Sequence, residues 1–339
     1  MTNDYSKCFK SKGVTMNKIE NNYYIDNIKF VLIFFVVFGH LIERYMEGNY
    51  ILMGIYIFIY TFHMPLFIFI SGLLSKSINK SRKFLLRKLL IPYIVLNIIW
   101  YSLAYLYTKE TYIPVIYPGW TLWFLLSLFF WRISLKYLIK IKYILPISFI
   151  LGIFIGLVPN GSMLSFSRTI VYLPFFLLGY YTNINTLNKL YNSINIWISI
   201  LGISMFIALA LFISENNIIS YSFLYGSYSY LELGMNIFKG SVYRVILYLC
   251  SIILSTFILT VIPNKKTFYT SMGKSTMYVY VYHIYVILII FYLIPAWNKN
   301  ILTMWIILAS PIFVTYILSK KVFARVYDKF FNSIFKLIK

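Results

Sequence analysis

Lys29 and His40 are the first two residues of this chain whose side chains could take part in catalysis or ligand binding together. They lie eleven positions apart in the first long apolar run, IDNIKFVLIFFVVFGHLI. On an α-helix this separation is about three turns, which places both side chains within roughly 20° of one face and about 16 Å apart along the axis. Ionisable groups at membrane depth are costly and usually face a bundle interior or a water-filled path. The pair therefore indicates a functional site.

His40 has two neighbours that favour a catalytic role. Gly39 removes a side chain beside it and gives close access to the backbone or to a ligand. Glu43, three residues on, can accept a hydrogen bond from one ring nitrogen, and a neutral imidazole oriented in this way is what a general base requires. The alternative is a core histidine that bonds between helices, with Glu43 paired to Arg44 or another cation at the outer rim.

Lys29 also has two interpretations. It can snorkel to the cytoplasmic lipid phosphates, paired with Asp26 three residues before it. It can instead help to bind a polyanionic ligand from the cytoplasm, together with basic residues at the same membrane face. Those residues are Arg82, Lys83, Arg87 and Lys88. Anchoring of positive charge explains most of that cluster, but it does not readily explain an arginine inside the apolar boundary.

Further polar and aromatic residues are candidates for the wall of a pocket. His63 comes just before Pro65, whose freed backbone carbonyl could bond the imidazole, and His283 lies in an aromatic-rich run where packing is the more frequent role. Trp120 and Trp123 suit the outer membrane interface, but tryptophans beside a pocket also stack on sugar rings. Arg168 is either an anchor or a counter-charge near an outer or central cavity.

Composition and apolar runs define the elements that must position these residues. Sixty per cent of the 339 residues are hydrophobic and 12% are charged, which excludes an ordinary soluble domain. We expect an all-α polytopic bundle of about ten spans, with a polar tail at 1–24, one membrane domain at 25–319 and a basic tail at 320–339. The ten runs are 25–43, 51–75, 84–107, 119–135, 143–158, 165–182, 195–213, 241–262, 273–293 and 301–319.

The net charge of +22 is distributed by membrane side. With a cytoplasmic N-terminus and alternating runs, 25 of the 31 Lys and Arg residues lie on the cytoplasmic side. This positive-inside pattern predicts a multi-pass protein of the plasma membrane with both termini in the cytoplasm, and it makes nucleic acid an unexpected partner. Residues 1–24 lack the features of a signal peptide.

No cofactor or metal signature is present in the sequence. The two cysteines, Cys8 and Cys250, lie in no position to form a disulfide. The chain contains no CxxC, no cluster with metal-ligand spacing, no phosphate-binding Walker loop and no GxGxxG. We therefore expect no metal and no tightly bound cofactor.

Six short motifs, taken in order along the chain, resemble those of the acyltransferase-3 family of integral-membrane O-acyltransferases, and within it the fucose 4-O-acetylase-like branch. The likeness covers about residues 24–293 and is carried by DNIKFVLIFFVVFGH, FHMPLFIFISG, RKLLIPY, GWTLWFL, FSRTIVYLPFFLLGYY and GKSTMYVYVYH. The resemblance implies a ten-span bundle that moves an acyl group, usually acetyl from cytoplasmic acetyl-CoA, to a hydroxyl of a bacterial surface or lipid-linked glycan. Acetyl-CoA would then be a co-substrate and the lipid bilayer the setting, with glycan-synthesis proteins as possible partners.

The family signature of a cation, ten residues and a histidine falls on Lys29 and His40. The family's basic residues of the third span fall on Arg82, Lys83, Arg87 and Lys88, with Arg87 as the best match. The soluble HxxxD acyltransferase motif is absent, because Arg44 stands at its fourth position. Many relatives carry a soluble hydrolase-like domain after the bundle, and we expect this chain to work without one.

The sequence is compatible with two roles of His40 and with two classes of function. His40 could deprotonate the acceptor hydroxyl for direct attack or could itself carry the acyl group, and direct transfer needs one fewer step. A glycan transporter or flippase is the rival function, because it too would be a bundle with buried polar groups. No second copy of the GH or FHMP pattern is evident, which weakens that rival.

Overall fold

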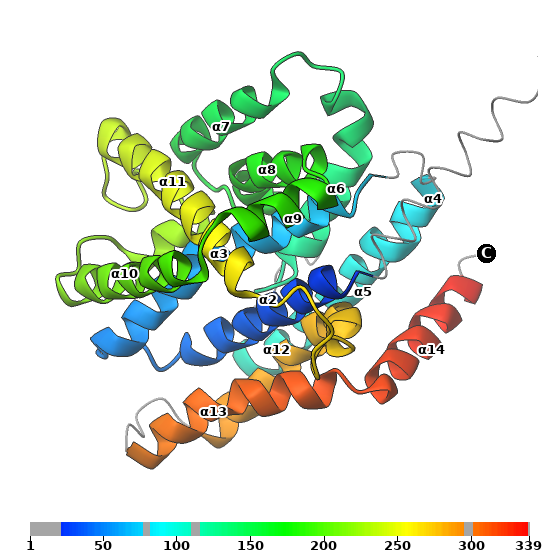
Figure 1. Cartoon of the computed structure of the whole chain (residues 1–339). Coiled ribbons are helices and arrows are strands. Elements are labelled where there is room, and N and C mark those ends of the chain that lie inside the picture. Colours follow the sequence, from blue (N-terminus) through cyan, green and yellow to red (C-terminus); the bar gives the residue numbers. More distant parts are fainter. Residues whose placement is uncertain (1–21, 77–81, 110–115, 295–300, 338–339) are drawn as a thin grey trace, which may run out of the picture.

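The computed structural model describes residues 22–76, 82–109, 116–294 and 301–337. The described residues form helices and contain no strand, which confirms the all-α fold class (Figure 1). Each of the ten predicted apolar runs contains a helix. These helices are α2 (Tyr23–Ile42), α3 (Tyr50–Leu73), α5 (Ile91–Thr108), α6 (Trp123–Leu138), α7 (Ile144–Phe154), α8 (Phe166–Tyr181), α10 (Ile196–Glu215), α11 (Ile237–Val261), α12 (Thr276–Leu293) and α13 (Ile301–Leu318).

Fewer than ten of these helices are long enough to cross a bilayer. Seven helical segments of the described chain have the length and apolar composition of a span. An eighth is obtained if α13 and α14 (Lys321–Leu337), which meet at a 60° bend, count as one span. Helix α6 has 16 residues and α7 has 11, against about 20 needed for the hydrocarbon core. A polytopic helical protein is therefore confirmed, while the number ten is not.

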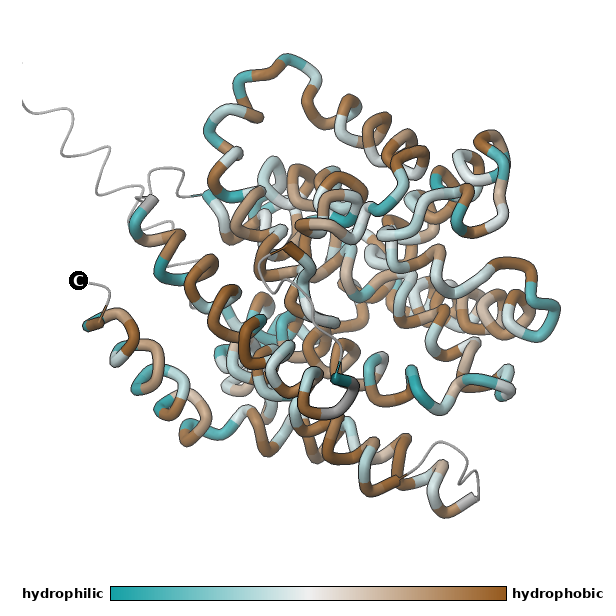
Figure 2. Tube along the Cα trace, turned by 180° about the vertical axis from the view of Figure 1, so that it is seen from behind, coloured by the Kyte–Doolittle hydropathy of each residue, from teal (hydrophilic) through white to brown (hydrophobic). Residues whose placement is uncertain are grey.

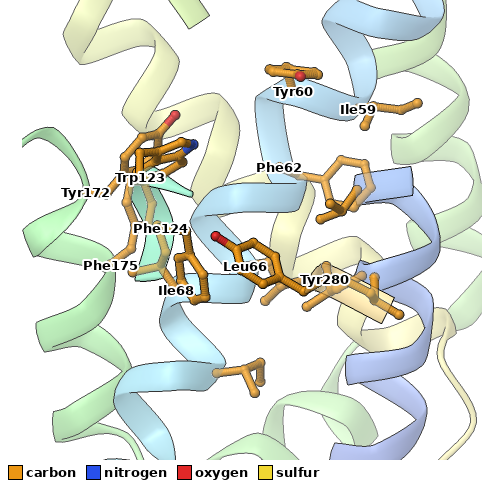
Figure 3. Packing of buried hydrophobic residues seen from close by; sticks show 14 of the residues in the cluster. Ile59, Tyr60, Phe62, Leu66, Ile68, Trp123, Phe124, Tyr172, Phe175 and Tyr280 are labelled. Atoms are coloured by element: carbon orange, nitrogen blue, oxygen red, sulfur yellow. The ribbon is translucent and has the colours of Figure 1, made fainter. Parts of the chain in front are cut away.

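Helix α3 lies at the centre of the bundle. It packs against α2, α8, α10 and α11, while α2 in turn contacts α12 and α13. Figure 2 shows hydrophobic residues along most of the helices, with hydrophilic residues gathered at helix ends and connections. Aromatic and aliphatic side chains fill the space between α3 and its neighbours, as Figure 3 shows for Phe62, Leu66, Trp123 and Tyr172.

Two glycines allow α3 and α8 to cross at backbone contact. A Cβ atom on Gly72 would collide with the backbone carbonyl of Phe176, and one on Gly179 would collide with that of Phe69. Helices in lipid gain no hydrophobic driving force from each other, so they associate through such close van der Waals approach. Gly72 and Gly179 thus mark the point where the two helices cross.

Pro65 changes the bonding of α3 in a way that differs from the expectation for His63. Proline lacks an N–H, so the carbonyl of Thr61, four residues earlier, loses its helical partner. The hydroxyl of Ser251 on α11 donates to that carbonyl at 2.6 Å. The imidazole of His63 bonds to the carbonyl of Ile59 instead, at 2.7 Å.

The basic third run begins with an irregular helix. A short α4 (Arg82–Leu85) leads into a π-helical turn, η1 (Leu86–Leu90), which carries Arg87 and Lys88. Pro92 stands one residue into α5, and its ring would clash with the carbonyl of Lys88 in a regular α-helix. The wider π turn accommodates this clash.

The segment predicted as a basic tail contains α14. Apolar residues of α14 pack on the bundle through Phe331, which is buried, and Tyr327, whose ring lies 5.5 Å from that of Tyr278. The guanidinium of Arg87 lies 5.9 Å from the ring centre of Phe335. Residues 1–21, with most of the predicted N-terminal tail and Cys8, lie outside the described residues.

Candidate active site

A cavity of about 130 Å³, here called the His40 cavity, contains most of the predicted pocket residues. Its wall comes from α2, α3, α6 and α8, and from residues 224–228 in the connection between α10 and α11. The lining residues are His40, Glu43, Tyr60, His63, Met64, Trp120, Trp123, Arg168, Tyr172, Leu224, Tyr225 and Tyr228. Five predicted candidates are thus brought together with His40, namely Glu43, His63, Trp120, Trp123 and Arg168.

His40 and Glu43 are in direct contact at the end of α2. The Nδ1 atom of His40 lies 3.1 Å from Oε2 of Glu43. A carboxylate only accepts hydrogen bonds, so Nδ1 carries the proton and Nε2 is left with a free lone pair. The side chain of His40 is 13% exposed, so it is partly buried, and it lines the cavity.

Glu43 is held by donors from two other parts of the chain. The indole Nε1 of Trp120 donates to Oε2 at 3.2 Å, and the hydroxyl of Tyr225 donates to Oε1 at 3.2 Å. Tyr225 in turn accepts a hydrogen bond from the hydroxyl of Tyr56 at 2.9 Å. Burial, and then the negative charge of Glu43, raise the pKa of Tyr225 well above its usual value, so its phenol stays protonated and donates.

Tyr60 approaches His40 from α3 because Gly39 has no side chain. Its hydroxyl lies 3.3 Å from Nδ1 of His40. A Cβ atom on residue 39 would sit 3.0 Å from Cε2 of the Tyr60 ring, which is tighter than ordinary packing allows. Gly39 therefore provides the close access that the sequence indicates, and the group that uses it is an aromatic ring.

The other two histidines flank this arrangement. Nδ1 of His63 donates to the carbonyl of Ile59, and Nδ1 of His283 donates to the carbonyl of Tyr280 at 2.7 Å. Because carbonyls only accept, both rings have the same tautomer as His40, with Nε2 as the acceptor. The His283 ring centre lies 5.6 Å from that of His40, and Nε2 of His283 is buried with no hydrogen-bond partner.

Arg168 lies above Trp123 in the same cavity. Its Nε donates to the carbonyl of Tyr225 at 3.1 Å and its Nη2 to the hydroxyl of Ser227 at 3.3 Å. Its guanidinium carbon lies 5.1 Å from the Trp123 ring centre. Arg168 thus fixes the connection that delivers Tyr225 to Glu43.

A second cavity of about 190 Å³, here called the Lys29 cavity, lies toward the other end of α2, α3, α6 and α12. Its two cations are Lys29 and Arg132, and the rest of its wall is mainly apolar. The lining residues are Lys29, Leu32, Phe67, Ile70, Ser71, Leu74, Phe124, Leu128, Arg132, Thr276, Met277 and Tyr280. The two cavities therefore follow each other along α2, α3 and α6.

Lys29 has features of both predicted interpretations. Its Nζ forms an ion pair with Oδ1 of Asp26 at 2.7 Å, and it also lines the cavity. Asp26 is buried and its Oδ2 has no partner, so the ammonium is the counter-charge of this carboxylate. Arg132 is held by a hydrogen bond from its Nε to the hydroxyl of Ser75 at 3.0 Å.

Three basic residues of the third run, Lys83, Arg87 and Lys88, do not line the Lys29 cavity. Lys83 and Lys88 are exposed on α4 and η1, Arg87 is partly buried against Phe335, and the side chain of Arg82 lies outside the described residues. The segments α4 and η1 pack against α6, the helix that carries Arg132. The structure thus places this basic surface beside the cavity wall and not within it.

Sequence reasoning did not single out Tyr60, Tyr225 or Arg132 as site residues. Tyr60 and Tyr225 are two of 33 tyrosines in a chain rich in aromatic residues, so neither was distinguishable by type. Arg132 lies in an apolar run, which is the same signal that drew attention to His40 and Arg87. That signal could have identified it.

Comparison with known proteins identifies the domain. A family model described as an acyltransferase domain, that of the acyltransferase-3 family, matches residues 22–320. No curated protein and no solved structure matches the chain.

Proposed function

The chain belongs to the acyltransferase-3 family and is a membrane acyltransferase, and from this membership we propose that it moves an acetyl group from acetyl-CoA to a hydroxyl of a cell-surface or lipid-linked glycan. The observation that carries the proposal is the contact between His40 and Glu43 in the His40 cavity. The Lys29 cavity, which has two cations in a mainly apolar wall, lies next to it along the same helices. The resemblance to the fucose 4-O-acetylase-like branch supports a sugar hydroxyl as the acceptor.

The donor would occupy the Lys29 cavity. Coenzyme A has a long pantetheine arm between its phosphates and its thioester, and the apolar wall of this cavity suits such an arm. Lys29 and Arg132 supply charge-assisted hydrogen bonds for polar groups of the donor, and the basic surface of α4 and η1 supplies further charge for its phosphates. His40 lies about 16 Å further along α2, where the thioester would arrive.

The chemical step assigns one task to each member of the His40 cluster. Nε2 of His40 takes the proton of the acceptor hydroxyl while the hydroxyl oxygen attacks the thioester carbonyl carbon. A C–O bond forms, the C–S bond breaks, and the coenzyme A thiolate leaves with the proton that the imidazolium returns. Glu43 stabilises the imidazolium through Nδ1, and Tyr225 and Trp120 hold Glu43 in place. Transfer through an acyl-His40 intermediate would use the same contacts, with Nε2 as the nucleophile.

We further propose that the protein resides in the plasma membrane with both termini cytoplasmic. The partition of basic residues supports this orientation. The Lys29 cavity then lies toward the cytoplasm, where acetyl-CoA is found, and the His40 cavity lies toward the outer side.

Replacement of His40 tests the proposal. We expect His40→Ala to lower the rate of acetyl transfer by about 10²–10⁴-fold, the contribution typical of a general base. The assay follows thioester consumption by the purified protein with acetyl-CoA and a glycan extract, and mass spectrometry identifies the acetylated glycan. Normal transfer by His40→Ala would show that His40 is structural. Glycan movement without thioester consumption would favour a transporter.

A further inference from the structure

We propose that the acceptor is an anionic amphiphile, a saccharide linked through phosphate to a lipid, whose hydrocarbon chain lies in a groove between α3, α10 and α11. This inference rests on the proposed function and specifies the acceptor of the same site. It is drawn from an apolar groove beside the His40 cavity and from a cation in that cavity that forms no ion pair with any acid of the described residues.

The groove is a cavity of about 230 Å³ with an almost entirely hydrocarbon and aromatic wall. Its few polar side chains include Thr61, whose hydroxyl is already bonded to the carbonyl of Ile57 at 2.8 Å. The lining residues are Ile57, Phe58, Thr61, Phe206, Leu209, Ala210, Ile213, Ile218, Ile219, Phe223, Leu224, Tyr243, Ile246, Leu247, Cys250 and Leu254. Such a wall suits a hydrocarbon chain and offers little to a sugar.

The groove opens on the outside of the bundle and ends beside the reactive histidine. Leu209, Ile218 and Ile246 at its rim are 46, 43 and 49% exposed, so in a membrane they face lipid. Phe223 and Leu224 at its inner end are buried. Leu224 lines both the groove and the His40 cavity, so the two cavities adjoin each other at this residue.

Arg168 supplies the charge on the other side of Leu224. Among the described residues no acid forms an ion pair with it, although it is partly buried in the His40 cavity. Its Nε and Nη2 are bonded to protein oxygens, which leaves Nη1 for a ligand. A buried cation is costly unless it is paired, and arginine is well suited to phosphate.

The combination of groups matches one kind of molecule. The apolar groove adjoins the His40 cavity at Leu224, and that cavity is lined by both Arg168 and His40. A lipid-phosphate-linked saccharide has a hydrocarbon chain, a phosphate and sugar hydroxyls, one group for each of these features. Its chain would enter sideways from the bilayer, its phosphate would pair with Arg168, and a sugar hydroxyl would reach Nε2 of His40.

Photolabelling of the purified protein in phosphatidylcholine nanodiscs tests the groove. The probe is a polyprenyl phosphate with a diazirine in its hydrocarbon chain, and labelled peptides are mapped by mass spectrometry. We expect label on α10, on residues 218–224 and on α11. Ala210→Phe fills the groove and should reduce labelling about tenfold, in line with the cost of overpacking. Ala208→Phe, an exposed position on the same helix, is the matched control and should leave labelling unchanged.

Competition between the photoprobe and unlabelled lipids tests whether the protein recognises the phosphate of the ligand. Unlabelled polyprenyl phosphate should displace the probe about tenfold better than uncharged polyprenol, and Arg168→Gln should abolish that difference. Equal displacement by phosphatidylglycerol would show that the groove holds ordinary membrane lipid and would overturn the proposal. Label outside the groove, or equal labelling of Ala210→Phe and Ala208→Phe, would overturn it as well.

The binding experiment is independent of acetyl transfer, so the two proposals can fail separately. If the wild-type protein consumes no acetyl-CoA with any acceptor but binds the probe as expected, the proposed reaction is wrong and the groove assignment holds. If it acetylates a water-soluble saccharide as readily as a lipid-linked one, and Ala210→Phe changes neither rate, the reaction holds and the groove assignment is wrong.

Discussion

At the scale of single residues, the His40 cluster combines a short-range pair with long-range support. The pair of His40 and Glu43 is set by one turn of α2, whereas Tyr225, 182 residues away from Glu43, holds the second carboxylate oxygen. The hydrogen bond from Tyr225 holds the carboxylate in place. Tyr225 is therefore a positioning residue whose removal should slow the chemical step.

We predict that Tyr225→Phe lowers kcat while the KM for acetyl-CoA stays nearly unchanged. Without the phenol, Oε1 of Glu43 loses a hydrogen bond, and the carboxylate is held less firmly against Nδ1 of His40, so we expect kcat to fall by about tenfold. Steady-state kinetics with acetyl-CoA as the varied substrate measure both constants. Tyr221→Phe, on the same short helix η4 (Tyr221–Tyr225), should leave kcat unchanged. An unchanged kcat in Tyr225→Phe would show that Tyr225 only packs.

The ion pair of Lys29 with Asp26 changes how Lys29 must be tested. Lys29→Ala should raise the KM for acetyl-CoA and also lower the thermal stability, because it leaves the buried Asp26 carboxylate without its counter-charge. Lys29→Arg should retain the wild-type KM for acetyl-CoA and the wild-type thermal stability.

Arg132→Gln should raise the KM for acetyl-CoA with kcat nearly unchanged, since Arg132 contributes to binding and not to the chemical step. Coenzyme A titration checks this, and unchanged affinity in both Lys29→Ala and Arg132→Gln would remove the donor from the Lys29 cavity.

At the scale of elements, the third run begins with the π turn η1 in place of a regular α-helix. Pro92 explains the π turn of η1, and the turn sets the direction of Arg87 and Lys88 relative to α5. Pro92→Ala restores a donor to the helix and removes the clash with the carbonyl of Lys88. We expect η1 to revert to a regular α-helix, which rotates the basic residues and raises the KM for acetyl-CoA.

The control for Pro92→Ala is Pro311→Ala, which makes the same change inside α13 at a residue that lines neither cavity. It should leave the KM unchanged. Steady-state kinetics with acetyl-CoA as the varied substrate compare the two variants. Equal KM values for both would mean that the basic surface of α4 and η1 does not contact the donor.

At the scale of the whole molecule, the orientation in the membrane decides whether the Lys29 cavity faces the cytoplasm, where acetyl-CoA is found. Lys83 on α4 and Leu231 in the connection before α11 are both exposed, and the positive-inside pattern puts them on opposite sides. We predict that a membrane-impermeant maleimide labels Leu231→Cys in intact cells and Lys83→Cys only after permeabilisation, in a background with Cys8 and Cys250 replaced by serine. Labelling of both positions in intact cells would reject the orientation, and with it a cytoplasmic donor cavity.

The helices, and the spacing of residues along each of them, could be predicted from the amino-acid sequence alone. Apolar runs predict helices because backbone groups in lipid must bond within their own segment, and each run contains one. The positions of Lys29, His40 and Glu43 on one helix follow from helical geometry alone, so their relation was readable from residue numbers. The family was likewise recognisable from ordered motifs.

The residues from distant parts of the chain that complete the site follow from the packing of the helices. Tyr60 reaches His40 because Gly39 lets α3 approach α2, and Tyr225 reaches Glu43 because Arg168 holds its connection. The structure does not confirm ten spans within the described residues, since apolar composition does not fix where the turns around α6 and α7 end those helices. Such contacts depend on packing between segments far apart in the chain, and hydrophobic periodicity within one segment contains no information about its neighbours.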